Sequence, residues 1–69
     1  MNISLEYYKV FYNVAKLGSI SAAANSLFIS QPAVSQAIKH LETALDARLF
    51  NRTSKGVRLT PEGEALYNL

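Results

Sequence analysis

The sequence predicts a mostly α-helical domain with three helices in its core and a two-stranded hairpin after them. Apolar residues recur at helical spacing in two stretches before residue 46, and the turn-forming segment 53–56 lies between two short apolar runs. A chain of 69 residues can build only one core. Because 49% of the residues are hydrophobic and 17% are charged, we expect the chain to fold rather than remain disordered.

The first helix is expected near residues 4–17, and Gly18 is a plausible C-terminal stop. Its helically spaced residues are Leu5, Tyr8, Phe11, Tyr12, Val14 and Ala15. We expect this ridge to lie in the core. Rings that stack on nucleic-acid bases must be exposed, whereas these rings recur on one helical stripe. A short second helix is expected from Ala22 to about Phe28, with Ser19 or Ser21 as its N-cap.

The third helix is expected over residues 31–45, after a turn short enough to make a helix-turn-helix. Ser30 is a natural N-cap, and Pro32 in the first turn costs no intrahelical hydrogen bond. One side of this helix is an apolar stripe about 60° wide. The stripe consists of Val34, Ile38, Leu41 and Leu45.

The other side of the third helix is polar and nearly free of carboxylates. Its outward residues are Gln31, Pro32, Ser35, Gln36, Lys39 and Thr43. A polar helix start without acids, followed by a basic segment, is the arrangement that enters a DNA major groove. Simple solvent exposure is the alternative interpretation of each of these side chains taken alone.

A two-stranded hairpin, or wing, is expected over residues 49–59, with its turn at residues 53–56. The net charge of +2 is uninformative, but the segment 47–60 contains no acid. Its basic residues are Arg48, Arg52, Lys55 and Arg58. Such a patch can bind phosphate, although four charges on a solvated hairpin also occur in proteins that bind nothing.

A fourth helix is expected to begin at Pro61, with Thr60 as its N-cap. Glu62 and Glu64 are favourably placed at the positive end of its dipole. The remaining residues form only about two turns, which are not independently stable. We therefore expect this helix to continue into a packing partner.

Several function classes are disfavoured by what the sequence lacks. Without cysteine there is no disulfide or thiolate site, and His40, the single histidine, cannot form a multi-histidine metal site. No G-x-S-x-G segment or glycine-rich phosphate loop is present, so we expect no enzyme and no cofactor. The start MNISLEYYK does not have the pattern of a signal peptide and no apolar run is long enough to span a membrane, so we expect a cytoplasmic location without membrane association.

Several motifs occur in order along the chain. They are Ala23-Ala24, Ser30-Gln31-Pro32-Ala33-Val34-Ser35, Leu41-Glu42, Leu49-Phe50-x-Arg52 and Leu59-Thr60-Pro61-x-Gly63. Together they closely resemble the N-terminal winged helix-turn-helix domain of LysR-type bacterial transcriptional regulators, over nearly the entire chain. The resemblance implies sequence-specific binding of double-stranded DNA, with helix 31–45 in the major groove and wing 49–59 on the flanking backbone or minor groove.

The resemblance also implies a domain organisation. Residues 1–60 would form the DNA-binding domain and residues 61–69 the truncated start of a linker helix that pairs in a dimer. A C-terminal domain that senses a small-molecule effector would follow and is absent from this chain. The full-length protein would be a homodimer or tetramer, whereas this fragment is expected to be monomeric or weakly dimeric.

By similarity, the expected base contacts come from the start of the third helix: Gln31, Pro32, Ser35 and Gln36. The expected contacts to the DNA backbone or minor groove are Ser21, Lys39, Arg52, Ser54 and Lys55. We interpret Arg48 as a charge on a surface turn, and assign Lys9 and Lys16 to solvent.

The sequence departs from the family pattern at two positions. Gln36 stands where many relatives carry arginine, so an amide, whose preferred bidentate partner is adenine, would replace a guanine-directed fork. Asp46 replaces the usual glycine after the third helix, and a left-handed backbone there costs aspartate more than glycine. The alternative function is a winged-helix protein-interaction module, but such a module would show apolar residues on the outward side of the third helix.

Overall fold

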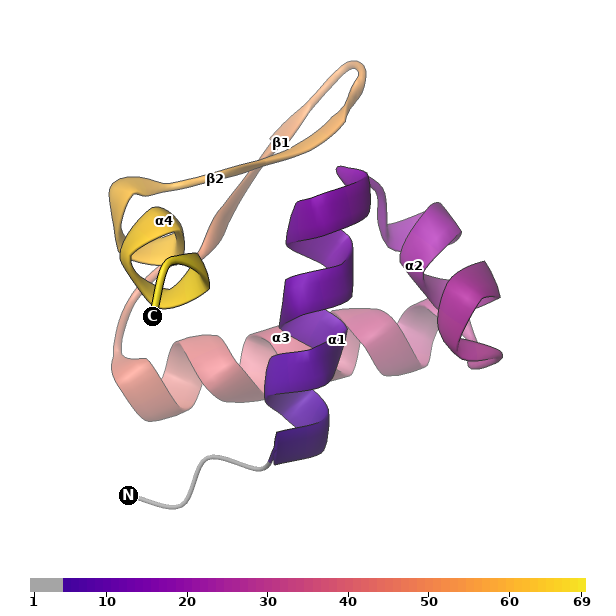
Figure 1. The fold of residues 1–69 in the computed structure, drawn as a ribbon, viewed down its shortest axis with the longest axis horizontal. Helices are drawn as coiled ribbons and strands as arrows, with labels where there is room; N and C mark the ends of the chain where they lie inside the picture. Colours follow the sequence, from indigo (N-terminus) through magenta and orange to yellow (C-terminus); the bar gives the residue numbers. More distant parts are fainter. Residues whose placement is uncertain (1–4) are drawn as a thin grey trace.

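The computed structural model describes residues 5–69, and its elements follow the expected order. They are α1 (Leu5–Leu17), α2 (Ile20–Leu27), α3 (Gln31–Leu45), β1 (Phe50–Thr53), β2 (Gly56–Leu59) and α4 (Pro61–Tyr67). In Figure 1, α1 crosses α3, α2 lies beside them at one end of α3, and the hairpin extends from α4 past the end of α1. The expected helix start near residue 4 and the segment MNIS lie outside the described residues.

The core lies where α1, α2 and α3 meet the start of the hairpin. Phe11 and Phe50 bring α1 and β1 together, with ring centroids 5.3 Å apart. Because α2 contributes only alanine side chains to the buried set, its backbone can approach the other helices closely. The buried apolar residues are Val10, Phe11, Val14, Ala23, Ala24, Val34, Ala37, Ile38, Leu41, Leu49 and Phe50.

The ridge of α1 is only partly buried, so the expectation that all of it lies in the core is wrong. Leu5 is 68% exposed and Tyr12 is 41% exposed. Tyr12 instead stacks on Tyr67 of α4, with 5.0 Å between ring centroids. Partial burial, together with the neighbouring phenol of Tyr12, raises the pKa of Tyr67 above its ordinary value. Tyr12 therefore packs against α4 rather than in the core.

The boundaries of α2 differ from those expected. Gly18 ends α1 at φ 67°, and Ser19 caps α2 by accepting a hydrogen bond from the Ala22 amide at 3.0 Å. The helix therefore starts at Ile20 rather than at Ala22, and Ser21 is not its cap. It ends one residue earlier than expected because Phe28 adopts a left-handed conformation, with φ 58° and ψ 40°.

The end of α3 has the left-handed backbone that was considered for Asp46, with φ 50° and ψ 47°. The amide of Asp46 donates to the carbonyl oxygens of Glu42 and Thr43, which closes the helix. The apolar stripe is confirmed for Val34, Ile38 and Leu41, but Leu45 is only half-buried. Leu45 nevertheless packs against the edge of the core.

Four residues connect the end of α3 with β1 and α4, and we refer to Glu42, Leu49, Thr60 and Gly63 as the wing base. Glu42 Oε2 accepts a hydrogen bond from the Leu49 amide at 2.8 Å. The buried Thr60 hydroxyl donates to the Arg48 carbonyl and accepts from the Gly63 amide at 3.0 Å, so it caps α4 as expected. A Cβ on Gly63 would lie 2.2 Å from the Leu49 carbonyl oxygen, so only glycine fits there.

Candidate nucleic-acid interface

The start of α3 presents the expected polar surface. Ser30 is the N-cap, and its hydroxyl accepts a hydrogen bond from the Ala33 amide at 3.2 Å. Gln31, Pro32 and Gln36 are exposed, whereas Ser35 is half-buried. We call these four outward residues the recognition surface: Gln31, Pro32, Ser35 and Gln36.

Within residues 5–69, the polar side chains of the recognition surface make no hydrogen bonds to the rest of the protein. Gln31 and Gln36 each offer an amide with two donors and an acceptor, and Ser35 offers a hydroxyl. The backbone behind them is held by the Ser30 cap and by the buried Val34 and Ile38. A rigid helix therefore presents unengaged hydrogen-bonding groups to solvent.

The wing is a two-stranded antiparallel sheet in which Phe50 pairs with Leu59 and Thr53 with Gly56. At its tip the Thr53 hydroxyl accepts from the Lys55 amide at 3.2 Å and donates to the Gly56 carbonyl at 3.3 Å. The expected contact residues of the wing, Arg52, Ser54 and Lys55, are all exposed.

The wing is fixed to the turn between α1 and α2. The Val57 amide donates to the carbonyl oxygen of Gly18 at 3.2 Å. Gly56, with φ 133°, lies so close to this turn that a Cβ would be 2.3 Å from the same oxygen. The orientation of the wing relative to α3 is therefore set by a contact between segments far apart in sequence.

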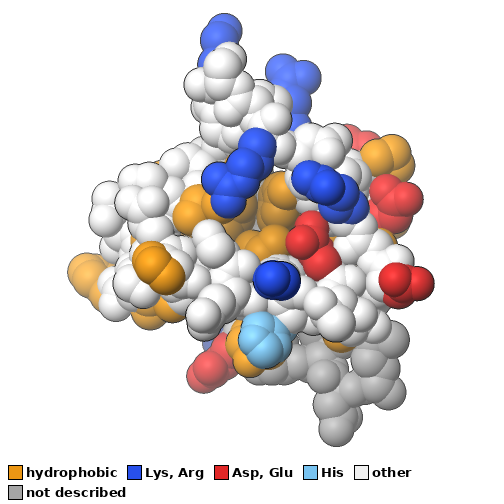
Figure 2. Space-filling model, turned by 180° about the vertical axis from the view of Figure 1, so that it is seen from behind, with side chains coloured by type: hydrophobic (Ala, Val, Ile, Leu, Met, Phe, Trp, Pro, Cys, Tyr) orange, Lys and Arg blue, Asp and Glu red, His pale blue; other side chains and the backbone are white. Residues whose placement is uncertain are grey.

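Between α3 and the wing lies a concave surface that we call the basic hollow. Lys39 from α3, Arg48 from the connecting loop and Arg52 from β1 form its charged rim, and Ser35 and Glu42 also line it. Its apolar lining consists of Ile20, Ile38, Phe50 and Val57. Figure 2 shows this face, with basic side chains around an apolar floor.

The charge of the basic hollow favours an anion. Glu42 is its only acidic residue, and one of its carboxylate oxygens is already engaged by the Leu49 amide. Three exposed cations from three segments therefore surround an apolar surface. Phosphate groups that follow one another along a nucleic-acid backbone match this arrangement.

The structure brings some predicted contact residues together and leaves others apart. Lys39 and Arg52 share the basic hollow, and Ser35 links it to the recognition surface. Ser54 and Lys55 lie at the wing tip, away from the hollow. Ser21 is exposed on the first turn of α2 but does not line the hollow, although its neighbour Ile20 does.

Two residues near this face were not among the contacts expected from the sequence. Arg48, interpreted as a surface charge, lines the hollow beside Lys39 and Arg52. His40 is exposed and stacks on Tyr7, with ring centroids 5.0 Å apart. The acid-free run 47–60 pointed to Arg48. For His40, a single histidine on the outward side of a helix gave no signal by itself, because solvent exposure explains it equally well.

Within the part of the chain that the structure describes, no three His, Cys, Asp or Glu residues are grouped to hold a metal ion. None of the helices formed by those residues is both long and apolar enough to cross a bilayer.

Comparison with known proteins places the chain in a family. Residues 5–64 match the model described as "Bacterial regulatory helix-turn-helix protein, lysR family". The chain is 45% identical over 65 residues to the transcriptional regulator BudR of Klebsiella aerogenes, covering 94% of this chain and 46% of BudR. It is 50% identical over 58 residues to the regulator YofA of Bacillus velezensis, covering 84% of this chain and 20% of YofA.

Solved structures agree with this assignment. The structure of the "CbnR_DBD-DNA complex" matches with a TM-score of 0.88 and 34% identity, covering 99% of this chain and 76% of that chain. The chain spans less than half the length of either curated relative named above. Because the family model covers most of the chain, this protein belongs to the LysR family of bacterial regulatory helix-turn-helix proteins.

Proposed function

We propose that this chain binds double-stranded DNA sequence-specifically, as the DNA-binding domain of a transcriptional regulator. The observation that carries the proposal is the recognition surface, which lies beside the basic hollow and whose polar side chains make no hydrogen bonds within residues 5–69. Similarity to a LysR-type domain in complex with DNA supports it, since the match covers 99% of the chain. The relatives are regulators of transcription, and we propose a non-enzymatic role in the cytoplasm.

In this proposal, α3 lies in the major groove and its recognition surface faces the base edges. Gln31 and Gln36 donate and accept hydrogen bonds at purine edges, and the amide of Gln36 suits N6 and N7 of adenine. The Ser35 hydroxyl reaches a base edge, and the ring of Pro32 provides an apolar contact. These side chains provide the sequence preference.

The basic hollow and the wing provide affinity that does not depend on sequence. Lys39, Arg48 and Arg52 neutralise phosphates, and condensed counterions leave the DNA as they bind. Ser54 and Lys55 at the wing tip contact the backbone or the minor groove, and Ser21 meets a phosphate near the start of α2. Together these contacts fix the register of α3 in the groove.

The longer relatives suggest the context of this domain. We propose that residues 1–60 form the DNA-binding unit and residues 61–69 begin a linker helix that pairs in a homodimer or tetramer. The curated relatives named above extend well beyond the matched region, which leaves room for a C-terminal domain that binds a small-molecule effector. The half-buried Leu66 and Tyr67 on α4 are consistent with such a helix.

A protein-interaction role is not favoured by the surface of α3. Its exposed residues after the N-cap are polar apart from Pro32: Gln31, Gln36, Lys39, His40 and Thr43. Protein-binding hot spots are instead enriched in aromatic and other large side chains.

Selection of bound duplexes from a randomised DNA library tests the proposed function. We expect enrichment of a defined motif, and binding of that motif that weakens steeply as salt concentration rises. Binding of mixed-sequence DNA alone, without enrichment, would contradict sequence-specific recognition. Absence of salt-dependent binding to any duplex would contradict DNA binding altogether.

A further inference from the structure

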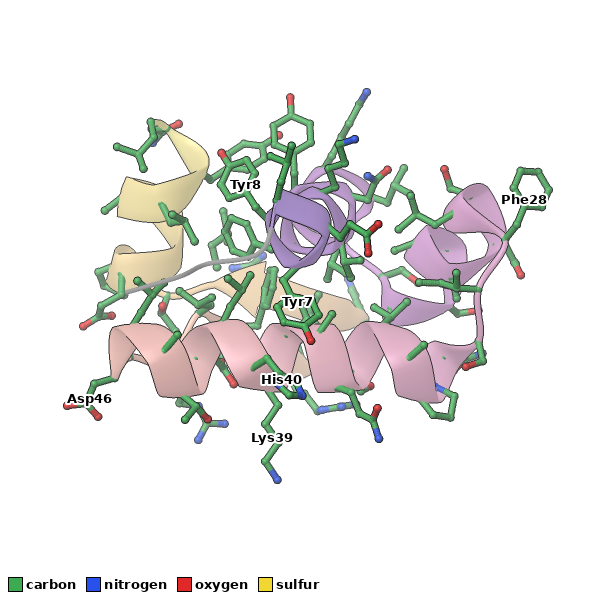
Figure 3. All side chains as sticks on the ribbon, turned by 90° about the horizontal axis from the view of Figure 1, so that it is seen from below. Tyr7, Tyr8, Phe28, Lys39, His40 and Asp46 are labelled. Atoms are coloured by element: carbon green, nitrogen blue, oxygen red, sulfur yellow. The ribbon has the colours of Figure 1, made fainter. Side chains whose placement is uncertain are left out.

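His40 lies on the same face as the basic side chains, although it was assigned no contact from the sequence. Figure 2 shows the single histidine of the chain next to basic side chains of this face. In Figure 3, Lys39 extends from α3 away from α1, whereas His40 lies on the near side of α3, where Tyr7 reaches down from α1 to the imidazole. The Tyr7 and His40 rings stack at an interplanar angle of 30°.

Helical geometry places His40 and Lys39 on opposite sides of Gln36. At about 100° per residue, Lys39 lies about 60° to one side of Gln36 and His40 about 40° to the other side. Lys39 lines the basic hollow that α3 shares with the wing, whereas His40 is absent from that lining. Gln36, Lys39, His40 and Thr43 together line a second, shallow depression on α3.

A straight helix in the major groove contacts bases with its N-terminal residues and approaches the phosphates further along. His40 is one helical turn beyond Gln36, about 6 Å along the axis, where a side chain is close to a DNA strand. Lys39 and the wing lie together on one side of α3, around the basic hollow. With α3 in the groove as proposed, the imidazole of His40 would face the DNA strand on the other side.

We propose that His40 is a further phosphate-contact residue, whose protonated ring donates a hydrogen bond to a DNA phosphate on the side of α3 remote from the wing. This inference rests on the proposed DNA binding. A protonated imidazole carries a positive charge and two N–H donors. A neutral imidazole is uncharged and has only one donor. DNA affinity therefore rises as the pH falls through the range in which histidine gains its proton.

No carboxylate lines the depression around His40 among the described residues, so none there takes the place of a DNA phosphate as partner of the ring. The titratable group facing it from α1 is the phenol of Tyr7, whose ring also favours a cation stacked on it. The titratable neighbour on α3 is the ammonium of Lys39. Glu6, one residue before Tyr7 on α1, is a carboxylate.

The sequence makes the contribution of His40 measurable. The chain contains one histidine and no cysteine, so apart from the α-amino group, which every variant keeps, no other group ordinarily changes charge between about pH 8 and about pH 6. A change in DNA affinity over this range that disappears on replacing His40 therefore comes from the imidazole.

The test is fluorescence anisotropy of a labelled mixed-sequence duplex, because a phosphate contact does not require the operator. Affinity and its salt dependence are measured at about pH 8 and about pH 6 for the 69-residue chain and for His40→Gln and His40→Lys. Lys16→Gln, at an exposed α1 position outside the basic hollow, is the matched control for loss of a distant charge. Circular dichroism at both pH values checks that each variant is folded.

We expect the wild-type chain to bind about three to ten times more tightly at the lower pH, with a salt slope steeper by about one unit. His40→Gln should match the wild type at the higher pH and show no such gain, and His40→Lys should bind tightly at both. A gain that persists in His40→Gln, or is absent from the wild type, would overturn the inference. Loss of salt-dependent binding by the wild type at both pH values would instead overturn the proposed DNA binding.

Discussion

The recognition surface and the wing base use their polar groups in opposite ways. In the wing base, the Thr60 hydroxyl makes two hydrogen bonds and the Glu42 carboxylate makes one, all to backbone groups of the protein. On the recognition surface, the side chains of Gln31 and Gln36 make none within residues 5–69. The first set fixes the fold, and the second is left available for a partner.

The motifs that made the family recognisable include residues of both regions. The motif that includes Leu59-Thr60-Pro61-x-Gly63 contains the helix cap of α4 and the glycine that meets Leu49. Leu49 and Phe50 are buried, and Glu42 binds the backbone at Leu49. These parts of the resemblance therefore reflect packing. The motif at the start of α3 instead supplies residues of the recognition surface, on which Gln36 is the position that departs from the family pattern.

The comparison predicts that substitutions in the wing base reduce stability and that substitutions on the recognition surface reduce only DNA binding. The largest effect is expected for Gly63→Ala, because its Cβ would lie 2.2 Å from the Leu49 carbonyl oxygen. We expect a loss of about 3 kcal/mol or more in the free energy of unfolding, measured by urea denaturation.

Gly18→Ala is the matched control for Gly63→Ala. Nothing lies within 4 Å of a Cβ at Gly18, so only its φ of 67° is unfavourable for alanine. We expect a loss of about 1–2 kcal/mol there. Equal losses for the two variants would show that backbone crowding does not set the requirement for glycine in the wing base.

Thr60→Val should have the next largest effect. It removes the cap of α4 and the hydrogen bond to the Arg48 carbonyl while keeping the shape of the side chain. We expect a loss of about 2–3 kcal/mol in the free energy of unfolding. Thr60→Ser, which retains the hydroxyl, should recover most of it, and an equally unstable serine variant would assign the effect to packing instead.

Gln36→Ala should leave the free energy of unfolding nearly unchanged, because its exposed side chain makes no hydrogen bond to the described residues. It should weaken binding to the selected site by about 1–3 kcal/mol and relax the preference at one base pair. Competition binding with single-base variants of the site measures this change. An equal loss on mixed-sequence DNA would remove Gln36 from the base contacts.

Arg52→Ala should have the smallest effect on affinity and should act alike on all sequences. Arg52 is exposed on the rim of the basic hollow, so we expect the salt slope of binding to fall by about one unit. Arg48→Ala should do the same if both residues meet phosphate. A slope identical to that of Lys16→Gln in a salt titration would exclude the substituted arginine from the phosphate contacts.

The sequence by itself determined the elements whose signals are local. Ser30 before the apolar stripe of α3, Gly18 after α1, and Thr60 with Pro61 before α4 are all observed at these helix ends. Caps and helical spacing act over a few residues, so they can be recognised without knowing the fold. The helix that carries the recognition surface was therefore predicted with its observed bounds, 31–45.

The tertiary structure alone decided the features that depend on residues distant in sequence. The close contact between Gly56 and the Gly18 carbonyl orients the wing. Tyr12 stacks on Tyr67 of α4 instead of lying in the core. Arg48 joins Lys39 and Arg52 because the loop after α3 and strand β1 turn back beside that helix. Such contacts follow from chain topology and packing, which no local pattern specifies.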